Sequence, residues 1–294
     1  MYYRRKVVLS IIQLLADSTE KMSIQKIVFL YSQRKAKAEY DFIPYKYGCY
    51  SYSLKADLNT MVNKGLLSES EHTYEKEDKV DYHKLLRPAD QLLVQETVAS
   101  YGQMTRSQLI SHTYINYPFY AIHSTIAQDV VGKVKYSEIQ KLKPSDSRTV
   151  LFTIGYEGIS LETYLLRLVE NNVKMLIDVR KNAQSMKFGF SKKRLSMYCD
   201  NLGIEYVHYP EVGIESDKRK KLKDQNDYNE LFEQYTATTL RSETAGQLKI
   251  LNDLKDKKRV ALTCFEAEFC QCHRSHLARS ISMLPAFDYS IVHI

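Results

Sequence analysis

Residues 260–274, VALTCFEAEFCQCHR, decide how the second half of this chain folds. The first four residues form a short apolar run, which is typical of a buried strand, and a helical pattern begins at Ser275. The polar stretch between them is therefore expected to be a loop that joins a strand to a helix. It contains three thiols, two carboxylates, an imidazole and a guanidinium. Because ligands bind at such loops in open α/β sheets, we predict a functional site here.

The same order of an apolar run followed by a helical pattern recurs from residue 149 to residue 294. Short β-rich apolar runs alternate with helical patterns, which predicts an α/β fold: a mostly parallel, Rossmann-like sheet of about five strands with helices on both faces, in three layers. We expect strands at residues 150–154, 175–179, 206–208, 260–263 and 289–292, and helices at residues 161–170, 192–202, 228–240, 243–254 and 275–283.

Residues 1–135 follow a mainly helical pattern instead. One helix is expected at residues 3–16, and a second begins after Ser23, which can cap it. A third is expected at residues 51–63, where Gly65 suits the position after the helix. Two short strands are expected at residues 66–69 and 81–86, and this order predicts a winged-helix-like domain. Further helices are expected at residues 89–100, 105–113 and 118–129. Residues 136–148 are rich in Lys, Ser and Pro, so we expect a linker between this domain and residues 149–294.

The composition limits the class of protein. A chain of 294 residues can form two domains, and no apolar run approaches the ~20 residues that cross a bilayer. No signal peptide is expected at the N-terminus. The five cysteines are too few for a disulfide scaffold of this length, so we expect reduced thiols in a cytoplasmic protein.

The basic residues are concentrated near the N-terminus. Residues 1–50 contain nine Lys or Arg against four Asp or Glu, and tyrosines lie between them. Such a segment favours a polyanionic partner, and we expect nucleic acid, with DNA favoured. An ordinary solvated surface with half-buried packing tyrosines is the alternative. The candidate nucleic-acid contacts are Arg34, Lys35, Lys37, Lys46, Tyr47 and Lys55.

An ordered set of motifs runs through the second half of the chain. The motifs are Thr153-Ile-Gly155-Tyr156-Glu157-Gly158, Ile177-Asp178-Val179-Arg180, Ser185, Gly189-Phe190-Ser191, Gly203-Ile204-Glu205-Tyr206, Pro210-Glu211-Val212-Gly213, Cys264-Phe-Glu266 and Cys272-His273-Arg274. By these motifs, residues 150–285 resemble the bacterial family named domain of unknown function 488, and the resemblance implies a fold and a site but no established reaction. Ala183 and Ile214 replace a proline and a glycine of the family pattern, and Cys270 is not part of it. Residues 46–51 also resemble the SocA-type ("Panacea") helical domains.

These motifs follow the ends of different predicted strands. Since the carboxyl ends of parallel strands lie along one edge of a sheet, we expect the motif residues to converge there. Gly155 and Gly158 would let a ligand approach the backbone, although a tight turn alone would also need them. The candidate ligand-binding residues are Gly155, Tyr156, Arg180, Ser185, Glu211, Cys272, His273 and Arg274.

The residue types at this edge allow three chemistries. In the first, Glu157, Asp178 and Glu266 act as nucleophile or general acid and base on a nucleotide or nucleic acid, and arginines hold its phosphate. Ion pairs that only orient loops are the bland alternative. In the second, Cys264 is an activated thiolate, as in rhodanese-type enzymes. In the third, zinc is bound by Cys264, Cys270, Cys272 and His273, although this spacing is unusual for zinc. No other cofactor is expected.

We therefore predict a bacterial enzyme that acts on a nucleotide or on nucleic acid, as a hydrolase or an N-glycosidase, with a DNA-binding first domain. An anionic small molecule or nucleotide is the expected ligand of the second domain. The sequence is compatible with a homodimer but does not decide the oligomeric state. A regulator that senses a ligand without turnover is the competing hypothesis. A role in phage defence rests on association with this domain pairing alone.

Overall fold

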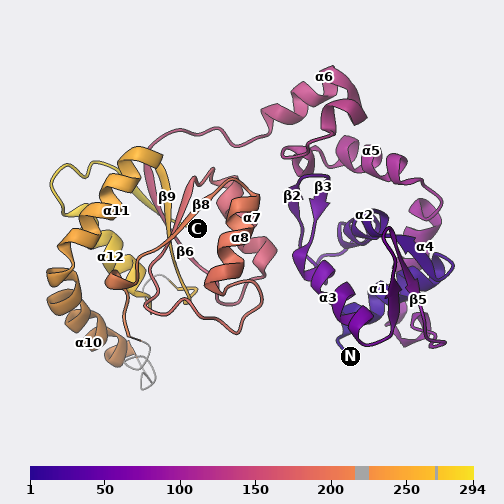
Figure 1. Ribbon diagram of the computed structural model, residues 1–294, viewed down its shortest axis with the longest axis horizontal. Helices are drawn as coiled ribbons and strands as arrows, with labels where there is room; N and C mark the ends of the chain where they lie inside the picture. The colour runs from indigo at the N-terminus through magenta and orange to yellow at the C-terminus, as the bar shows by residue number, and fades with distance from the viewer. Residues whose placement is uncertain (216–224, 269–270) are drawn as a thin grey trace. The chain divides into compact units, whose positions relative to one another are not determined.

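The computed structural model describes residues 1–215, 225–268 and 271–294. The chain divides into two compact units, residues 1–143 and residues 144–294 (Figure 1). Within the described ranges, no helix combines the length and the apolar character that a membrane crossing requires.

The second unit is built on a five-stranded sheet. Its strand order is β10-β6-β9-β7-β8, and every neighbouring pair is parallel. The inner strands β6, β7 and β9 are buried along their whole length, because a parallel sheet covered on both faces has no wet side. The strands are β6 (Val150–Gly155), β7 (Met175–Asp178), β8 (Glu205–His208), β9 (Arg259–Cys264) and β10 (Ser290–His293).

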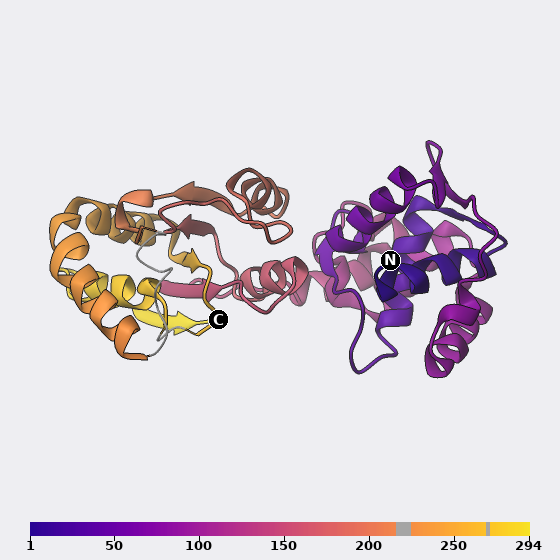
Figure 2. The same ribbon diagram turned by 90° about the horizontal axis from the view of Figure 1, so that it is seen from below.

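Helices cover both faces of this sheet. Helices α7 and α8 lie on one side of the strands, and α10, α11 and α12 lie on the other (Figures 1 and 2). In α7, Leu161, Leu165 and Leu168 follow the helical period and are all buried. The predicted α/β class and the parallel sheet are thus confirmed. The helices are α7 (Leu161–Glu170), α8 (Lys192–Asn201), α10 (Gln225–Tyr235), the π-helical turn η4 (Thr236–Leu240), α11 (Thr244–Lys257) and α12 (His273–Ser282), with a 3-10 turn η3 at Pro210–Val212.

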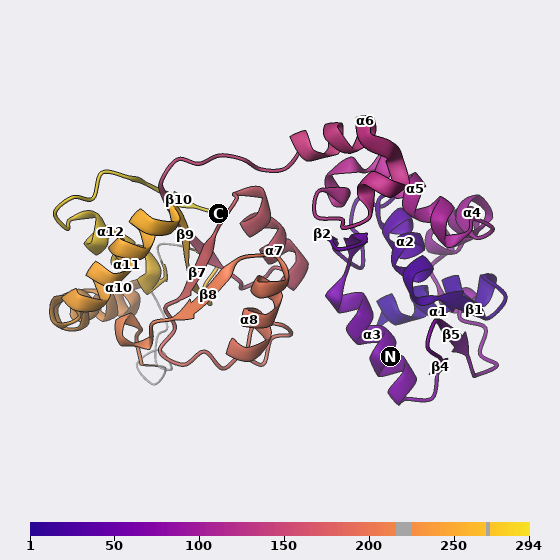
Figure 3. The same ribbon diagram turned by 45° about the horizontal axis from the view of Figure 1, so that its top comes forward.

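The first unit is mainly helical around one apolar core. A three-stranded antiparallel sheet of order β1-β5-β4 lies beside its helices (Figure 3), and β2 and β3 form a separate hairpin. The elements are α1 (Tyr3–Leu14), β1 (Ser18–Glu20), α2 (Lys21–Ser32), β2 (Ile43–Tyr45), β3 (Gly48–Tyr50), α3 (Tyr52–Asn63), β4 (Leu67–Glu69), β5 (Thr73–Lys76), η1 (His83–Leu85), α4 (Pro88–Tyr101), α5 (Arg106–Asn116), η2 (Pro118–Ala121) and α6 (Ala127–Lys141).

Capping explains where α3 begins and ends. The Ser51 hydroxyl accepts a hydrogen bond from the Leu54 amide at 3.2 Å, which satisfies one of the free N–H groups of the first turn. Gly65 follows the helix with a φ of 67°, a backbone conformation that glycine adopts without strain. Both signals were legible in the sequence.

Three predictions for the first unit are wrong, and a fourth, the linker, is wrong in part. The strand expected at residues 81–86 is the 3-10 turn η1, and β4 pairs instead with β5, which a turn at Ser70–His72 brings back at once. The helix expected at residues 118–129 is η2, and α6 starts only at Ala127. Ser23 lies inside α2, because this helix begins two residues earlier. Helix α6 continues to Lys141, so the first part of the expected linker, residues 136–148, is helical.

Candidate active site at the sheet edge

A pocket of about 250 Å³ lies at the carboxyl ends of β6, β7 and β9. Four predicted site residues, which are up to 108 positions apart in the chain, reach it: Tyr156, Arg180, Ser185 and Cys264. Ile214, one of the departures from the family pattern, also forms part of its wall. The lining residues are Tyr156, Arg180, Lys181, Asn182, Gln184, Ser185, Ile214, Cys264 and Phe265, and we call this cavity the edge pocket.

Arg180 faces the edge pocket as a fixed charge. Its Nε donates to Asp178 Oδ1 at 2.8 Å and its Nη2 donates to Oδ2 at 2.5 Å. Nη1 donates to the Tyr156 hydroxyl at 2.7 Å and to the Phe190 carbonyl at 3.0 Å. Burial opposes the charge, but the hydrogen bonds and charge of Asp178 outweigh it and raise the pKa of Arg180. The guanidinium is held in place before any ligand arrives.

Asp178 itself does not reach the pocket. Its side chain is fully buried, and besides Arg180 it accepts a hydrogen bond from the Tyr206 hydroxyl at 2.6 Å. Such a carboxylate can orient other groups but cannot touch a substrate in this arrangement. Asp178 therefore forms a structural ion pair that positions the end of the strand, which is the alternative to a catalytic role.

Tyr156 forms the aromatic wall of the pocket. Its ring stacks on Phe190 with 4.2 Å between the centroids, and its hydroxyl is also hydrogen-bonded to Ser185. Burial raises the pKa of Tyr156, so the hydroxyl stays protonated near neutral pH. Lys187, which the sequence did not single out, donates to the Tyr156 carbonyl, and burial lowers its pKa. Its position two residues before the Gly189-Phe190 motif was the one available signal.

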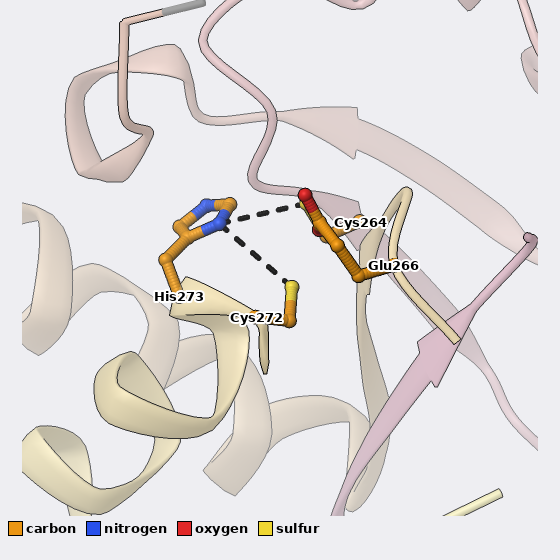
Figure 4. Close-up of side chains that lie close together, drawn as sticks. All are labelled: Cys264, Glu266, Cys272 and His273. Atoms are coloured by element: carbon orange, nitrogen blue, oxygen red, sulfur yellow. Dashed lines mark hydrogen bonds between the residues drawn. The ribbon is translucent and has the colours of Figure 1, made fainter. Parts of the chain in front are cut away.

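Behind the pocket, Cys264, Glu266, Cys272 and His273 form one cluster. Their side chains point toward one another (Figure 4), and the donor atoms all lie within 4.8 Å of each other. Cys264 Sγ lies 3.2 Å from Glu266 Oε2 and 3.5 Å from His273 Nδ1, and Cys272 Sγ lies 3.9 Å from the same nitrogen. Burial raises the pKa of Cys272 well above its usual value; Cys264 and Glu266 add to this effect, and Arg274 opposes it. We call these four residues the thiol cluster.

The loop that carries Cys264 and Glu266 is held by its own neighbours. Arg274, which is 2% exposed, donates to the carbonyls of Glu266 at 2.5 Å and Ala267 at 2.9 Å. Glu157, which is exposed, accepts a hydrogen bond from the Ala267 amide at 3.1 Å. Gly155 packs so closely that an added Cβ would lie 1.9 Å from the Glu266 carbonyl oxygen. Arg274, Glu157 and Gly155 therefore shape the loop and do not line the edge pocket.

Two other predicted residues lie apart. Glu211 lines a second cavity of about 170 Å³, which Lys181 and Ile214 share with the edge pocket. Cys270 lies outside the described residues, so the predicted zinc set is described only for Cys264, Cys272 and His273.

In the first unit, three candidate nucleic-acid contacts are engaged in ion pairs. Arg34 pairs with Glu96 at 2.5 Å, Lys35 with Asp90 at 2.6 Å and Lys55 with Glu69 at 3.2 Å. Each cation thus has an acidic neighbour, but Glu69 is shared between Lys55 and Lys21. Lys37, Lys46 and Tyr47 are exposed, and the last two lie at the turn between β2 and β3.

Comparison with curated proteins gives no match to this chain. A family match covers part of the second unit, from the start of α7 to the last turn of α12, and includes all four residues of the thiol cluster together with Asp178, Arg180 and Ser185. The Gly155–Gly158 motif lies before it. By this match, residues 160–281 are similar to the family described as Domain of unknown function DUF488.

Proposed function

We propose that this protein is a cytoplasmic enzyme that cleaves a nucleotide or a nucleic acid at the edge pocket. The observation that supports this proposal is the charge of the pocket. Arg180 and Lys181 line it, whereas their acidic partners Asp178 and Glu215 do not, and none of the described lining residues is a carboxylate. A small cavity with cations and no carboxylate among its described lining residues favours an anionic group such as a phosphate. This is also the position at which ligands bind in open parallel sheets.

The residues at and next to the pocket divide into four roles. Lys181 would hold the anionic group, and Arg180, whose N–H groups already bond Asp178, Tyr156 and Phe190, would contribute its charge at the wall. Asn182 and Ser185 would orient the group by hydrogen bonds. Cys264 and Glu266 are the reactive groups nearest to the pocket, 3.2 Å apart. Asp178 would act as a positioning residue through Arg180.

Product analysis tests this proposal. We expect the full-length protein to convert at least one member of a panel of nucleotides, NAD, DNA and RNA, with products identified by mass spectrometry. Glu266→Gln and Cys264→Ser should each lower turnover by about a hundredfold or more, the usual size of an acid–base contribution.

Two variants serve as matched controls. Glu268→Gln changes an exposed carboxylate of the same loop, and Cys199→Ser changes a buried thiol in α8, away from the pocket; both should keep wild-type turnover. Retention of a panel member without any product would contradict turnover and support the ligand-sensing regulator. Equal products from the wild type and both pocket variants would overturn the assignment of the site.

For the first unit we propose DNA binding through a winged-helix-like arrangement. The order α1-β1-α2-β2-β3-α3-β4-β5, in which the β2–β3 hairpin is inserted between α2 and α3, and the antiparallel sheet β1-β5-β4 support this comparison. Since Arg34, Lys35 and Lys55 are already paired with acids, the exposed Lys46 and Tyr47 at the β2–β3 turn are the better candidates for contact.

A salt titration tests this contact. DNA affinity should fall linearly with the logarithm of salt concentration, and Lys46→Ala should lower the slope by about 0.9 if the residue neutralises one phosphate. Lys84→Ala removes an equally charged, exposed lysine that pairs with Asp81, and the slope should not change. Affinity that does not depend on salt would refute phosphate contact.

A further inference from the structure

The thiol cluster has the composition of a metal site. Two sulfurs, one imidazole nitrogen and one carboxylate converge from the end of β9 and the start of α12 (Figure 4). Sulfur and imidazole donors suit zinc, whereas calcium and magnesium select oxygen donors. We propose that Cys264, Cys272 and His273 bind a zinc ion, with the Glu266 carboxylate as the fourth ligand.

The two nitrogen–sulfur distances within the cluster are close to those of a tetrahedral site. Zinc bonds of about 2.3 Å to sulfur and about 2.0 Å to nitrogen place a sulfur and a nitrogen ligand roughly 3.5 Å apart. Nδ1 of His273 lies 3.5 Å from Cys264 Sγ and 3.9 Å from Cys272 Sγ. These two separations thus differ from the tetrahedral value by at most a few tenths of an ångström, and all four donor atoms lie within 4.8 Å of one another.

The tautomer of His273 points its lone pair into the cluster. Nε2 lies 3.0 Å from the Val179 carbonyl oxygen, which can only accept a hydrogen bond, so Nε2 carries the hydrogen. Nδ1, the nitrogen that lacks a hydrogen whenever the ring is neutral, faces both sulfurs. A histidine that binds a metal through one nitrogen and donates from the other to a carbonyl is the usual arrangement at zinc sites.

Burial and charge fit the same occupant. Cys264, Cys272 and His273 are at most 1% exposed, so the ion would be shielded from water on the protein side. Zinc binding releases the two thiol protons, which leaves two thiolates and one carboxylate around a divalent cation, a net charge of −1. The guanidinium of Arg274, whose charge acts on Cys272, offsets it. Release of protons also means that zinc affinity should fall as pH falls.

The fourth ligand that we propose comes from the described residues. It is the carboxylate of Glu266, whereas Cys270, which the cysteine spacing suggests, lies outside them. Cys264 also lines the edge pocket, so the ion would lie at the floor of that pocket. This inference does not depend on the proposed reaction. If both hold, Cys264 and Glu266 would influence turnover as ligands of the metal.

Metal analysis of the untagged, full-length protein tests the site. We expect about one zinc per chain after purification without chelator, or after reconstitution with zinc chloride. Cobalt(II) in place of zinc should give the sulfur-to-metal charge-transfer band and the intense visible bands of tetrahedral thiolate coordination. Cys272→Ser and His273→Gln should weaken zinc binding by at least tenfold, and Glu266→Gln should alter the visible cobalt bands.

Two variants outside the thiol cluster serve as controls. Cys199→Ser removes a buried thiol outside the cluster, and Glu268→Gln an exposed carboxylate of the same loop; both should bind zinc as the wild type does. The wild-type measurements stand even if a cluster variant fails to fold. Three results would each overturn the proposal. The wild type takes up no zinc, or folded Cys272→Ser and His273→Gln bind zinc as the wild type does. The third is a Cys264–Cys272 disulfide in the protein purified under reducing conditions. Turnover by a zinc-free protein would leave the proposed function intact, and zinc without any product would leave the metal site intact.

Discussion

Asp178→Ala is expected to lower the free energy of unfolding of the second unit by about 3–5 kcal/mol, the cost of breaking a buried ion pair on one side. The Arg180 guanidinium, which is 5% exposed, would lose both of its hydrogen bonds to the carboxylate and remain as an uncompensated charge. The Tyr206 hydroxyl would lose its acceptor as well. Few single changes in this unit should cost as much.

Urea unfolding followed by circular dichroism measures this loss, since the chain contains no tryptophan. Hydrogen exchange of the β6–β10 sheet assigns the loss to the second unit. Glu205→Ala is the matched control in the same sheet: it removes the carboxylate of the Glu205–Lys257 pair, where both side chains are more than one third exposed. That loss should be at most about 1 kcal/mol. Similar losses for the two variants would show that the Asp178–Arg180 pair is not buried as described.

Gly155→Ala should have the second-largest effect, because the new methyl group has no space. Its Cβ would lie 1.9 Å from the Glu266 carbonyl oxygen and 2.8 Å from the carbonyl carbon, and backbone atoms cannot rotate away as a side chain can. Gly155 is also the strand partner of Cys264. The loop must therefore move away from β6, at a cost of about 1–3 kcal/mol or more.

Thiol reactivity reports this movement directly. Cys264 is 1% exposed in the native fold and should react slowly with an alkylating reagent. In Gly155→Ala we expect modification of Cys264, located by mass spectrometry, to be at least about tenfold faster, which corresponds to about 1.4 kcal/mol of easier opening. Gly203→Ala adds a methyl group with no atom within 4 Å; its φ of 70° strains the backbone, but Cys264 should keep its wild-type rate. Unchanged reactivity in Gly155→Ala would mean that the close approach is not rigid.

Most helices and strands of the second unit can be predicted from its sequence. The five strands and the helices fall within a few residues of their predicted bounds, and α7 matches at both ends. The physical reason is that a strand buried on both faces needs an unbroken apolar run, whereas a helix on the sheet shows a 3.6-residue period. The convergence of Tyr156, Arg180, Ser185 and Cys264 also follows from strand order alone, since parallel strands end along one edge.

The first unit was less legible, because its strands are only three or four residues long. β5 forms a strand because it pairs with β4 and β1. Its sequence, Thr73-Tyr-Glu-Lys76, contains one apolar side chain, that of Tyr74, and so gives little indication of a strand. The stretch that looks more apolar, residues 81–86, finds no strand partner among the described residues and forms a 3-10 turn. Pairing over distance outweighed local propensity here.

The sequence alone determined the fold class of the second unit, the edge at which its polar motifs gather, and the kinds of chemistry that those residue types allow. Only the tertiary structure decided what each group does there. It pairs Asp178 with Arg180, turns Arg274 toward the loop carbonyls, and directs His273 Nε2 to the Val179 carbonyl, 94 positions away, so that Nδ1 faces two thiols. Periodicity reports which side of an element is buried. It contains no information about hydrogen-bond partners that come from distant parts of the chain, and those partners fix the charge, the tautomer and the reach of every group in the site.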